Sequence, residues 1–196
     1  MIDYKNPNFF NQILKVEEIK IDRTHFFIEK FKNKNILHVG CADYMAYDPL
    51  SNLHIKLLNS GLNVDGYDLN SESLNILKKD AKKGNYYSHL DEFNDITYDL
   101  VLIPEVLEHV DNAKLFLDDM FSIKSKCYFI TVPNCEIYSK NMFYDNEYFH
   151  ELVHPDHKYW FSAYTLFNIC KKYIINNDAN LYYLEGRSMI AIEIFR

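Results

Sequence analysis

Hydrophobic positions along the chain change their spacing several times, and each change marks an expected structural element. Over residues 9–32 the apolar side chains recur at helical spacing, which predicts one broken helix or two short helices. The short apolar run 36–39 then ends at Gly40, as expected for a buried parallel strand followed by a tight turn. The chain is therefore expected to enter a sheet after an N-terminal helical segment, 1–33.

The segments that follow alternate between strand-like and helix-like patterns. Further strands are expected at 64–69, 86–90, 98–104 and 127–132, with helices at 49–60, at 71–83 and, after a cap at Asp111, through Phe121. Because strands that alternate with helices form parallel βαβ units, helices should cover both faces of the sheet. Ligands of such sheets bind beyond the carboxyl ends of the strands.

The last third of the chain departs from this alternation. A long connection rich in aromatic residues and histidine, 134–161, is followed by a helix at 162–173 and by strands at 181–184 and 189–195. The link between these two strands is so short that it can join only antiparallel neighbours. We therefore expect the α/β fold class, with a doubly wound, mostly parallel sheet of seven strands that ends in an antiparallel hairpin.

Composition and charge narrow the class of protein. A chain of 196 residues with 48% hydrophobic content suits a single domain, 1–196, and no repeat or proline-rich linker divides it. The net charge of −7 makes nucleic acid an unexpected partner, because phosphate binding needs clustered Lys and Arg. Neither a leader pattern nor an apolar stretch of membrane-spanning length is evident, so we expect a cytoplasmic protein without a membrane partner.

Three segments carry recognisable motifs. They are N-I-L-H-V-G-C-A at 35–42, G-Y-D-L-N at 66–70, and the segment 98–110 with its ending P-E-V-L-E-H-V. Together they resemble the class I S-adenosylmethionine-dependent methyltransferases, and the similarity extends over 34–195. The group that includes ubiquinone-biosynthesis and sugar-modifying enzymes is the most similar. The resemblance implies a Rossmann-like methyltransferase fold, with S-adenosylmethionine as cofactor and S-adenosylhomocysteine as product.

The cofactor pocket is expected at the ends of the first two strands. S-adenosylmethionine carries no pyrophosphate, so one sharp turn at Gly40, Cys41 and Ala42 can hold its amino-acid end. Asp68 at the end of the second strand is placed to accept hydrogen bonds from the ribose hydroxyls. The resemblance implies further contacts: Leu69 next to Asp68, Leu90 and Asp91 (or else His89) beside the adenine, and Pro104 with Glu105 near the methionine end and the methyl group.

Methyl transfer to a hydroxyl group needs a base that removes the acceptor's proton, and histidine suits this task near neutral pH. We expect His109, which follows the E-V-L-E sequence, and His154, which opens H-P-D-H-K-Y-W-F-S, to be the catalytic residues. Each has an alternative role in packing or helix capping. The candidates for acceptor binding lie in the aromatic connection and are Tyr148, His150, His157 and Trp160.

A metal site is the alternative role for the histidines of this connection. His150, His154 and His157 lie close in sequence to Asp156, and a bound cation could lower the pKa of the acceptor. Pro155 breaks any helix that would align His150 with His154, so we expect no metal. The four cysteines of the chain are dispersed without a C-x-x-C pair and indicate neither a zinc site nor a disulfide framework.

The function expected from these features is O-methylation of a small hydroxylated metabolite or carbohydrate. Transfer to nitrogen or to a carboxylate remains open, since neither acceptor needs a strong base. A scaffold with a degenerate cofactor pocket also remains open, because His38, Ala42 and Tyr44 replace the acid and the glycines that the family usually has. A nicotinamide dehydrogenase would need a glycine triplet for its pyrophosphate, which this sequence does not contain.

Overall fold

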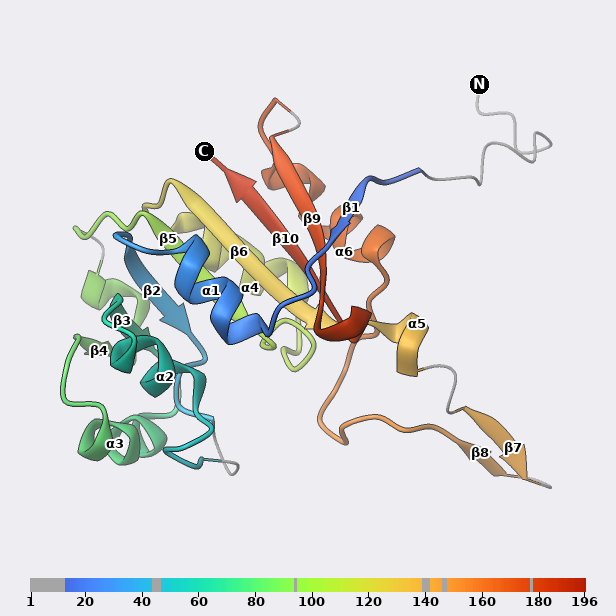
Figure 1. Cartoon of the computed structure of the whole chain (residues 1–196), viewed down its shortest axis with the longest axis horizontal. Coiled ribbons are helices and arrows are strands. Elements are labelled where there is room, and N and C mark those ends of the chain that lie inside the picture. Colours follow the sequence, from blue (N-terminus) through green and yellow to red (C-terminus); the bar gives the residue numbers. More distant parts are fainter. Residues whose placement is uncertain (1–12, 44–46, 94, 139–141, 146–147, 177) are drawn as a thin grey trace.

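The computed structural model describes residues 13–43, 47–93, 95–138, 142–145, 148–176 and 178–196. Its main feature is an eight-stranded sheet in the order β1-β9-β10-β6-β5-β2-β3-β4 (Figure 1). The strands of this sheet are β1 (Val16–Glu18), β2 (Asn35–Val39), β3 (Asn63–Tyr67), β4 (Tyr86–Tyr87), β5 (Leu100–Pro104), β6 (Cys127–Pro133), β9 (Ala179–Leu184) and β10 (Met189–Phe195). A separate hairpin joins β7 (Phe143–Asp145) to β8 (Tyr148–His150).

The helices are short and follow the strands. The α-helices of the described segments are α1 (Arg23–Lys30), α2 (Leu53–Asn59), α3 (Ser71–Asp80), α4 (Ala113–Ser122), α5 (Cys135–Tyr138) and α6 (Ala163–Cys170). Single 3-10 turns occupy Leu90–Phe93, Lys171–Tyr173 and Glu185–Arg187. Within these ranges no helix is both long and apolar enough to cross a lipid bilayer.

Strand pairing confirms the expected α/β class with its methyltransferase-like, Rossmann-type sheet. β2 pairs in parallel with β3 and with β5, and β5 pairs in parallel with β6. β10 is antiparallel to both β6 and β9, so the expected C-terminal hairpin is present. The sheet has eight strands rather than seven because β1 pairs in parallel with β9.

Each face of the sheet has its own hydrophobic core. Successive residues of a strand point to opposite faces, so each central strand contributes to both cores. Leu37 and Val101 pack in the core that includes residues of α4 and α6, whereas Ile36 and Leu100 pack in the core of α1, α2 and α3. Figure 1 shows α1 lying across one face of the sheet.

The helical prediction for 9–32 is wrong for part of that segment. Val16–Glu18 forms the strand β1, and the helix α1 begins only at Arg23, where the Asp22 side chain accepts a backbone hydrogen bond as its cap. The open backbone edge of β9 offers hydrogen bonds that outweigh the helical spacing of the side chains. Residues 9–12 lie outside the described part of the chain.

Two predicted boundaries also differ. β4 ends at Tyr87, and Leu90 begins a 3-10 turn rather than ending a strand. The cap of α4 is Asn112, whose side chain accepts a backbone hydrogen bond of the first turn at 3.1 Å. Asp111, which was expected to be the cap, instead forms an ion pair with Lys158 at 2.7 Å.

A buried polar network connects α1 with the antiparallel part of the sheet. Glu193 on β10 is 4% exposed, and its carboxylate accepts a hydrogen bond of 2.6 Å from the Tyr182 hydroxyl. The Lys30 ammonium lies 3.0 Å from the same carboxylate oxygen. A buried carboxylate gives up its hydration, and the Lys30 ammonium places a counter-charge beside it.

Replacement of Lys30 should therefore destabilise the fold. We expect Lys30→Met to lower the free energy of unfolding by about 2–3 kcal/mol, because Glu193 is left buried without its counter-charge. Urea denaturation at neutral pH measures the change, and the exposed Lys82→Met serves as the matched control. Equal stability of the two variants would show that the ion pair contributes little.

Candidate functional site

A cavity of about 230 Å³ lies where β2, β3 and the turn after β5 meet, at the carboxyl ends of the parallel strands. Gly40, Asp68, Leu69 and Leu90, all expected at the cofactor site, line this cavity. Seven further lining residues were not expected at the site from the sequence: Val39, Tyr67, Val106, Val110, Phe116, Asp119 and Met120. Apart from Asp119, these residues are apolar or aromatic. They follow the same sequence pattern as ordinary core residues, so no sequence signal marks them as lining a cavity.

Gly40 occupies a position that no other residue could take without strain. Its φ of +72° lies in the left-handed region, and a Cβ atom there would sit 2.5 Å from Cγ2 of Val106. The Gly40 N–H donates a hydrogen bond of 2.8 Å to the carbonyl of Tyr67 at the end of β3. The turn after β2 therefore lies directly against both β3 and the turn after β5.

Asp68 connects the first two motifs. One of its carboxylate oxygens accepts a hydrogen bond of 3.1 Å from the Ala42 N–H, and the other accepts one of 2.9 Å from the Asn70 N–H. Each oxygen keeps a further lone pair, and the residue lines the cavity. This geometry leaves acceptor capacity for a pair of hydroxyl groups.

Several expected cofactor contacts do not line this cavity. Cys41 and Ala42 are fully buried behind the turn, and a Cβ atom on Gly66 would lie 2.7 Å from the Cys41 sulfur. Asp91 is exposed on the 3-10 turn, and Pro104 is buried at the end of β5. These residues shape the cavity from behind or stand beside it.

The histidine that replaces the family's usual acid is part of a buried pair. His38 is 2% exposed, and its Nδ1 lies 3.2 Å from Nδ1 of His54, whose Nε2 lies 3.1 Å from the Tyr86 hydroxyl. Burial lowers the pKa of both imidazoles, that of His54 to about 4. Both rings are therefore neutral at pH 7 and form a structural chain from β2 to β4. Tyr44, the other departure, lies outside the described residues.

Two carboxylates follow β5 in a strained turn. Glu105 has a φ of +52°, and its Oε1 accepts a hydrogen bond of 2.8 Å from the Thr131 hydroxyl. Glu108 is 1% exposed, and among the described residues neither of its carboxylate oxygens has a hydrogen-bond partner. Burial, together with the nearby Glu105 charge, raises the pKa of Glu108 to about 9. Glu108 is therefore protonated at neutral pH.

Three histidines come together next to this turn. His109, His154 and His157 each place a ring nitrogen within 4.8 Å of the others. The Asp156 carboxylate lies 3.1 Å from Nδ1 of His109, and the Lys158 N–H donates a hydrogen bond of 2.7 Å to the Glu108 carbonyl. We call His109, His154 and His157 the histidine cluster; it brings together both catalytic candidates.

The metal site considered from the sequence consisted of a different set of histidines, namely His150, His154 and His157. His150 lies on β8, with its ring stacked on Phe143 at a centroid distance of 4.4 Å, and it is not part of the histidine cluster. His109 is the third member instead, because the backbone contact between Lys158 and Glu108 folds the two segments together. Pro155 does not prevent the grouping, since these imidazoles converge from a loop and not from a helix.

A second cavity of about 330 Å³ adjoins the cluster. Its lining residues are Pro133, Tyr138, Leu152, Val153, His154, His157 and Trp160. Trp160 and His157 were expected at the acceptor, but Tyr148 is 71% exposed on β8 and does not line this cavity. Tyr138 and Leu152 were missed, because aromatic and apolar residues in a long loop carry no spacing that marks a binding site.

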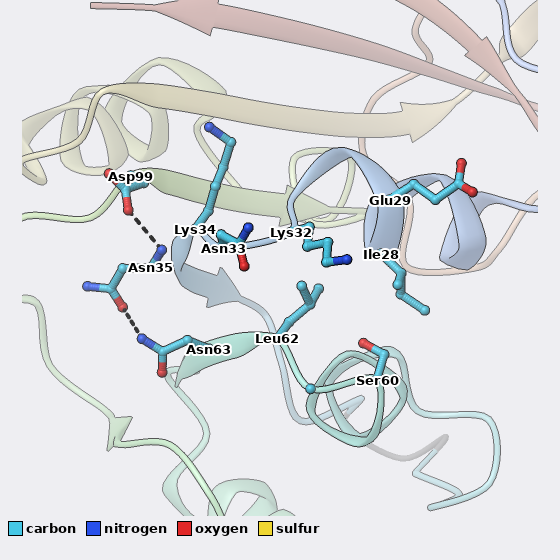
Figure 2. Close-up of a pocket in the computed structure, with 11 residues that line it drawn as sticks. Ile28, Glu29, Lys32, Asn33, Lys34, Asn35, Ser60, Leu62, Asn63 and Asp99 are labelled. Atoms are coloured by element: carbon cyan, nitrogen blue, oxygen red, sulfur yellow. Dashed lines mark hydrogen bonds between the residues drawn. The ribbon is translucent and has the colours of Figure 1, made fainter.

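A third cavity, of about 600 Å³, lies at the opposite end of the strands (Figure 2). It is bordered by the first residues of β2 and β3, where the Asn63 side chain donates a hydrogen bond of 3.1 Å to the Asn35 side chain. The Asn35 N–H donates one of 2.9 Å to Asp99. Because parallel sheets bind their ligands at the carboxyl ends, this cavity is not the candidate for the cofactor.

A mostly parallel sheet with a C-terminal antiparallel hairpin, and a cavity at Gly40 and Asp68 beyond the carboxyl ends of its strands, fit the class I methyltransferase type. The family model described as "Methyltransferase domain" matches residues 14–173. The chain therefore belongs to this family, and it is an S-adenosylmethionine-dependent methyltransferase with S-adenosylmethionine as its cofactor. No protein with a curated function matches the sequence.

Solved structures share this fold. The methyltransferase domain of a bacterial Hen1, CtHen1, is 17% identical with a TM-score of 0.62, over 89% of this chain and 98% of that chain. A chain of the Pnkp1/Rnl/Hen1 RNA repair complex is 16% identical with a TM-score of 0.60, over 89% of this chain but only 41% of that one. Magnesium protoporphyrin IX methyltransferase from Synechocystis PCC 6803, with bound SAM, is 13% identical with a TM-score of 0.55, over 88% of this chain and 76% of that chain.

The turn at Gly40 provides a direct test of the cofactor cavity. We expect Gly40→Ala to weaken S-adenosylhomocysteine binding at least tenfold, because the added methyl group would displace Val106 from the cavity wall. Isothermal titration calorimetry measures the affinity. Gly61→Ala is the matched control, since Gly61 also has a positive φ but a Cβ atom there meets nothing within 4 Å. Unchanged affinity in Gly40→Ala would place the cofactor elsewhere.

The raised pKa of Glu108 predicts a pH-dependent stability. A carboxyl group that is protonated in the folded state up to about pH 9, but titrates near 4.5 when unfolded, lowers the free energy of unfolding as pH rises between these values. Glu108→Gln should remove this dependence and stabilise the protein more at pH 8 than at pH 5, by about 2 kcal/mol or more.

Urea denaturation at both pH values, in the presence of a chelator, measures this difference. Glu72→Gln is the control, because Glu72 is exposed in the first turn of α3. An equal effect of Glu108→Gln at the two pH values would mean that Glu108 is ionised in the folded protein.

Proposed function

We propose that the chain transfers the methyl group of S-adenosylmethionine to a hydroxyl group of a small acceptor, with the histidine cluster receiving the proton. The observation that carries this proposal is that the histidine cluster adjoins the second cavity, whereas the chain neighbours of His109 line the first. Val106 and Val110, on either side of His109 in the chain, line the first cavity, and His154 with His157 line the second. An acceptor in the second cavity would present its hydroxyl to imidazoles and to the cofactor together.

In this proposal the first cavity holds the cofactor. Asp68 accepts hydrogen bonds from the ribose hydroxyls, and the turn at Gly40, supported by Cys41 and Ala42, holds the methionine end. Leu69 and Leu90 border the nucleoside, with Asp91 at the outer edge. The positions of Pro104 and Glu105 at the end of β5 favour a place near the methyl group. The free acceptor capacity of Asp68 supports this assignment.

The proposed chemistry is an in-line displacement at the methyl carbon. The acceptor oxygen forms a bond to the methyl group, the bond from carbon to the sulfonium sulfur breaks, and the sulfur keeps its electron pair. The hydroxyl proton passes to His109 or His154. Burial, with the charges of its histidine neighbours, lowers the pKa of His157, so this ring stays neutral beside them. The Asp156 carboxylate, 3.1 Å from Nδ1 of His109, orients this ring.

A metal-assisted version of the same reaction is the second candidate. The ring nitrogens of the histidine cluster converge within 4.8 Å, a spacing that suits one divalent cation. The buried Glu108 directly precedes His109, and among the described residues its carboxylate has no hydrogen-bond partner. A cation at the histidine cluster would lower the pKa of the acceptor hydroxyl and reduce the need for a base.

The acceptor itself is part of the proposal. The solved neighbours include a component of an RNA repair complex and a porphyrin methyltransferase, so the shared fold does not select a substrate. The net charge of −7 favours a small metabolite in the cytoplasm over a nucleic acid as the acceptor. The substrates of ubiquinone-biosynthesis or sugar-modifying enzymes are metabolites of this kind. Transfer to nitrogen or to a carboxylate is the alternative reaction.

Separate replacement of the two catalytic candidates tests the reaction type. We expect at least one of His109→Asn and His154→Asn to reduce kcat at least 100-fold on an acceptor found by a screen for S-adenosylhomocysteine release, because one of the two rings is the proton acceptor or both bind the metal. The affinity for S-adenosylhomocysteine should stay within twofold of the wild type. His25→Asn, at an exposed position on α1, is the control.

A chelator distinguishes the reaction with a histidine base from the metal-assisted reaction. If a cation acts, treatment with EDTA abolishes turnover and Mg²⁺, Mn²⁺ or Zn²⁺ restores it; if a histidine acts alone, EDTA has no effect. Full activity in both histidine variants would indicate a nitrogen or carboxylate acceptor. Failure of S-adenosylhomocysteine to bind the wild type would contradict the proposed cofactor cavity.

A further inference from the structure

The second cavity has an unusual lining for a site that meets a hydroxyl group. Five of its seven lining residues are apolar or aromatic: Pro133, Tyr138, Leu152, Val153 and Trp160. Its two polar residues, His154 and His157, belong to the histidine cluster. The lining of the second cavity is therefore mostly apolar, and its polar residues lie at the histidine cluster.

This distribution bears on what the cavity can hold. A carbohydrate carries hydroxyl groups around its whole ring, and each one that leaves water without a partner is unfavourable. A wall of proline, leucine, valine and aromatic carbon cannot replace those hydrogen bonds. A planar apolar group, in contrast, gains from leaving water and can pack against the rings of Tyr138 and Trp160, whose centroids are 6.0 Å apart.

We propose that the acceptor is a hydroxyl compound with a flat, apolar body, such as a substituted phenol, and that Tyr138, Leu152 and Trp160 determine this specificity. This inference rests on the proposed function, because it takes the histidine cluster as the reacting end. The apolar body fills the second cavity, and the hydroxyl group at its end meets His154 and His157. The cavity volume of about 330 Å³ is at the lower end of small-molecule sites and suits a small ring with a short substituent.

Trp160 makes the proposal measurable without turnover. It is the single tryptophan of the chain, so the intrinsic tryptophan fluorescence of the protein reports on this cavity alone. We expect 4-propylphenol to change the Trp160 emission of protein saturated with S-adenosylhomocysteine, in a saturable manner. Methyl glucoside, a hydroxylated probe without an apolar body, should bind at least tenfold more weakly.

Leu152 supplies a clean variant, because it lines the cavity and yet is 61% exposed, so a polar replacement leaves the core intact. Leu152→Asn should weaken 4-propylphenol binding at least fivefold. Leu115→Asn is the matched control: Leu115 is 59% exposed on α4 and lines none of the three cavities described above, and its replacement should leave the affinity within twofold.

The outcomes separate this inference from the proposed function. If methyl glucoside binds as tightly as 4-propylphenol, or if Leu152→Asn binds the phenol as well as the wild type, the apolar specificity is wrong. In either case, the kcat values of His109→Asn and His154→Asn still decide whether the proposed reaction is correct. If both histidine variants keep full activity while the phenol binds as described, the proposed reaction is wrong and the apolar cavity stands.

Discussion

The hydrogen bond from the Ala42 N–H to the Asp68 carboxylate is the contact on which the proposed cofactor site depends. It joins the turn after β2 to the end of β3, so the two motifs occupy one fixed position at the edge of the sheet. Gly40 makes the contact possible, because only a residue without Cβ fits its left-handed backbone against Val106. In the proposed site, the nucleoside binds to a carboxylate that the fold has already oriented.

The turn after β5 has two features that are unfavourable for folding. Glu105 has a left-handed backbone, and Glu108 is buried where it must be protonated at neutral pH. Neither feature helps the chain to fold. Both acids lie within a few residues of His109, which joins the histidine cluster. Strained residues and buried ionisable groups cluster at functional sites, so we expect the acceptor end of the proposed reaction at this turn.

Much of the fold could be predicted from the sequence because its strands are short, apolar and bounded by turn residues. The C-terminal hairpin was predicted from a link too short for a crossover. Val16–Glu18 could not be predicted as a strand, since its pairing depends on β9, about 160 positions further along the chain. Helical spacing of side chains is a local signal, and the open edge of a strand is a tertiary one.

The candidate site also could be predicted from the sequence only in part. Gly40 and Asp68, predicted because each ends a strand, line the first cavity, and His109, predicted from its motif, joins the histidine cluster. His150 was grouped with His154 by proximity in sequence, whereas the structure places His109 in that position. Phe116, Met120 and Leu152 were not foreseen, because an apolar residue that lines a cavity has the same pattern as one that fills the core.

A crystal structure of the protein with S-adenosylhomocysteine tests the central claim most directly. The account predicts that both ribose hydroxyls lie within hydrogen-bond distance of the Asp68 carboxylate, with the sulfur directed toward the histidine cluster. A nucleoside bound away from Asp68, or a sulfur that faces away from His109 and His154, would contradict it.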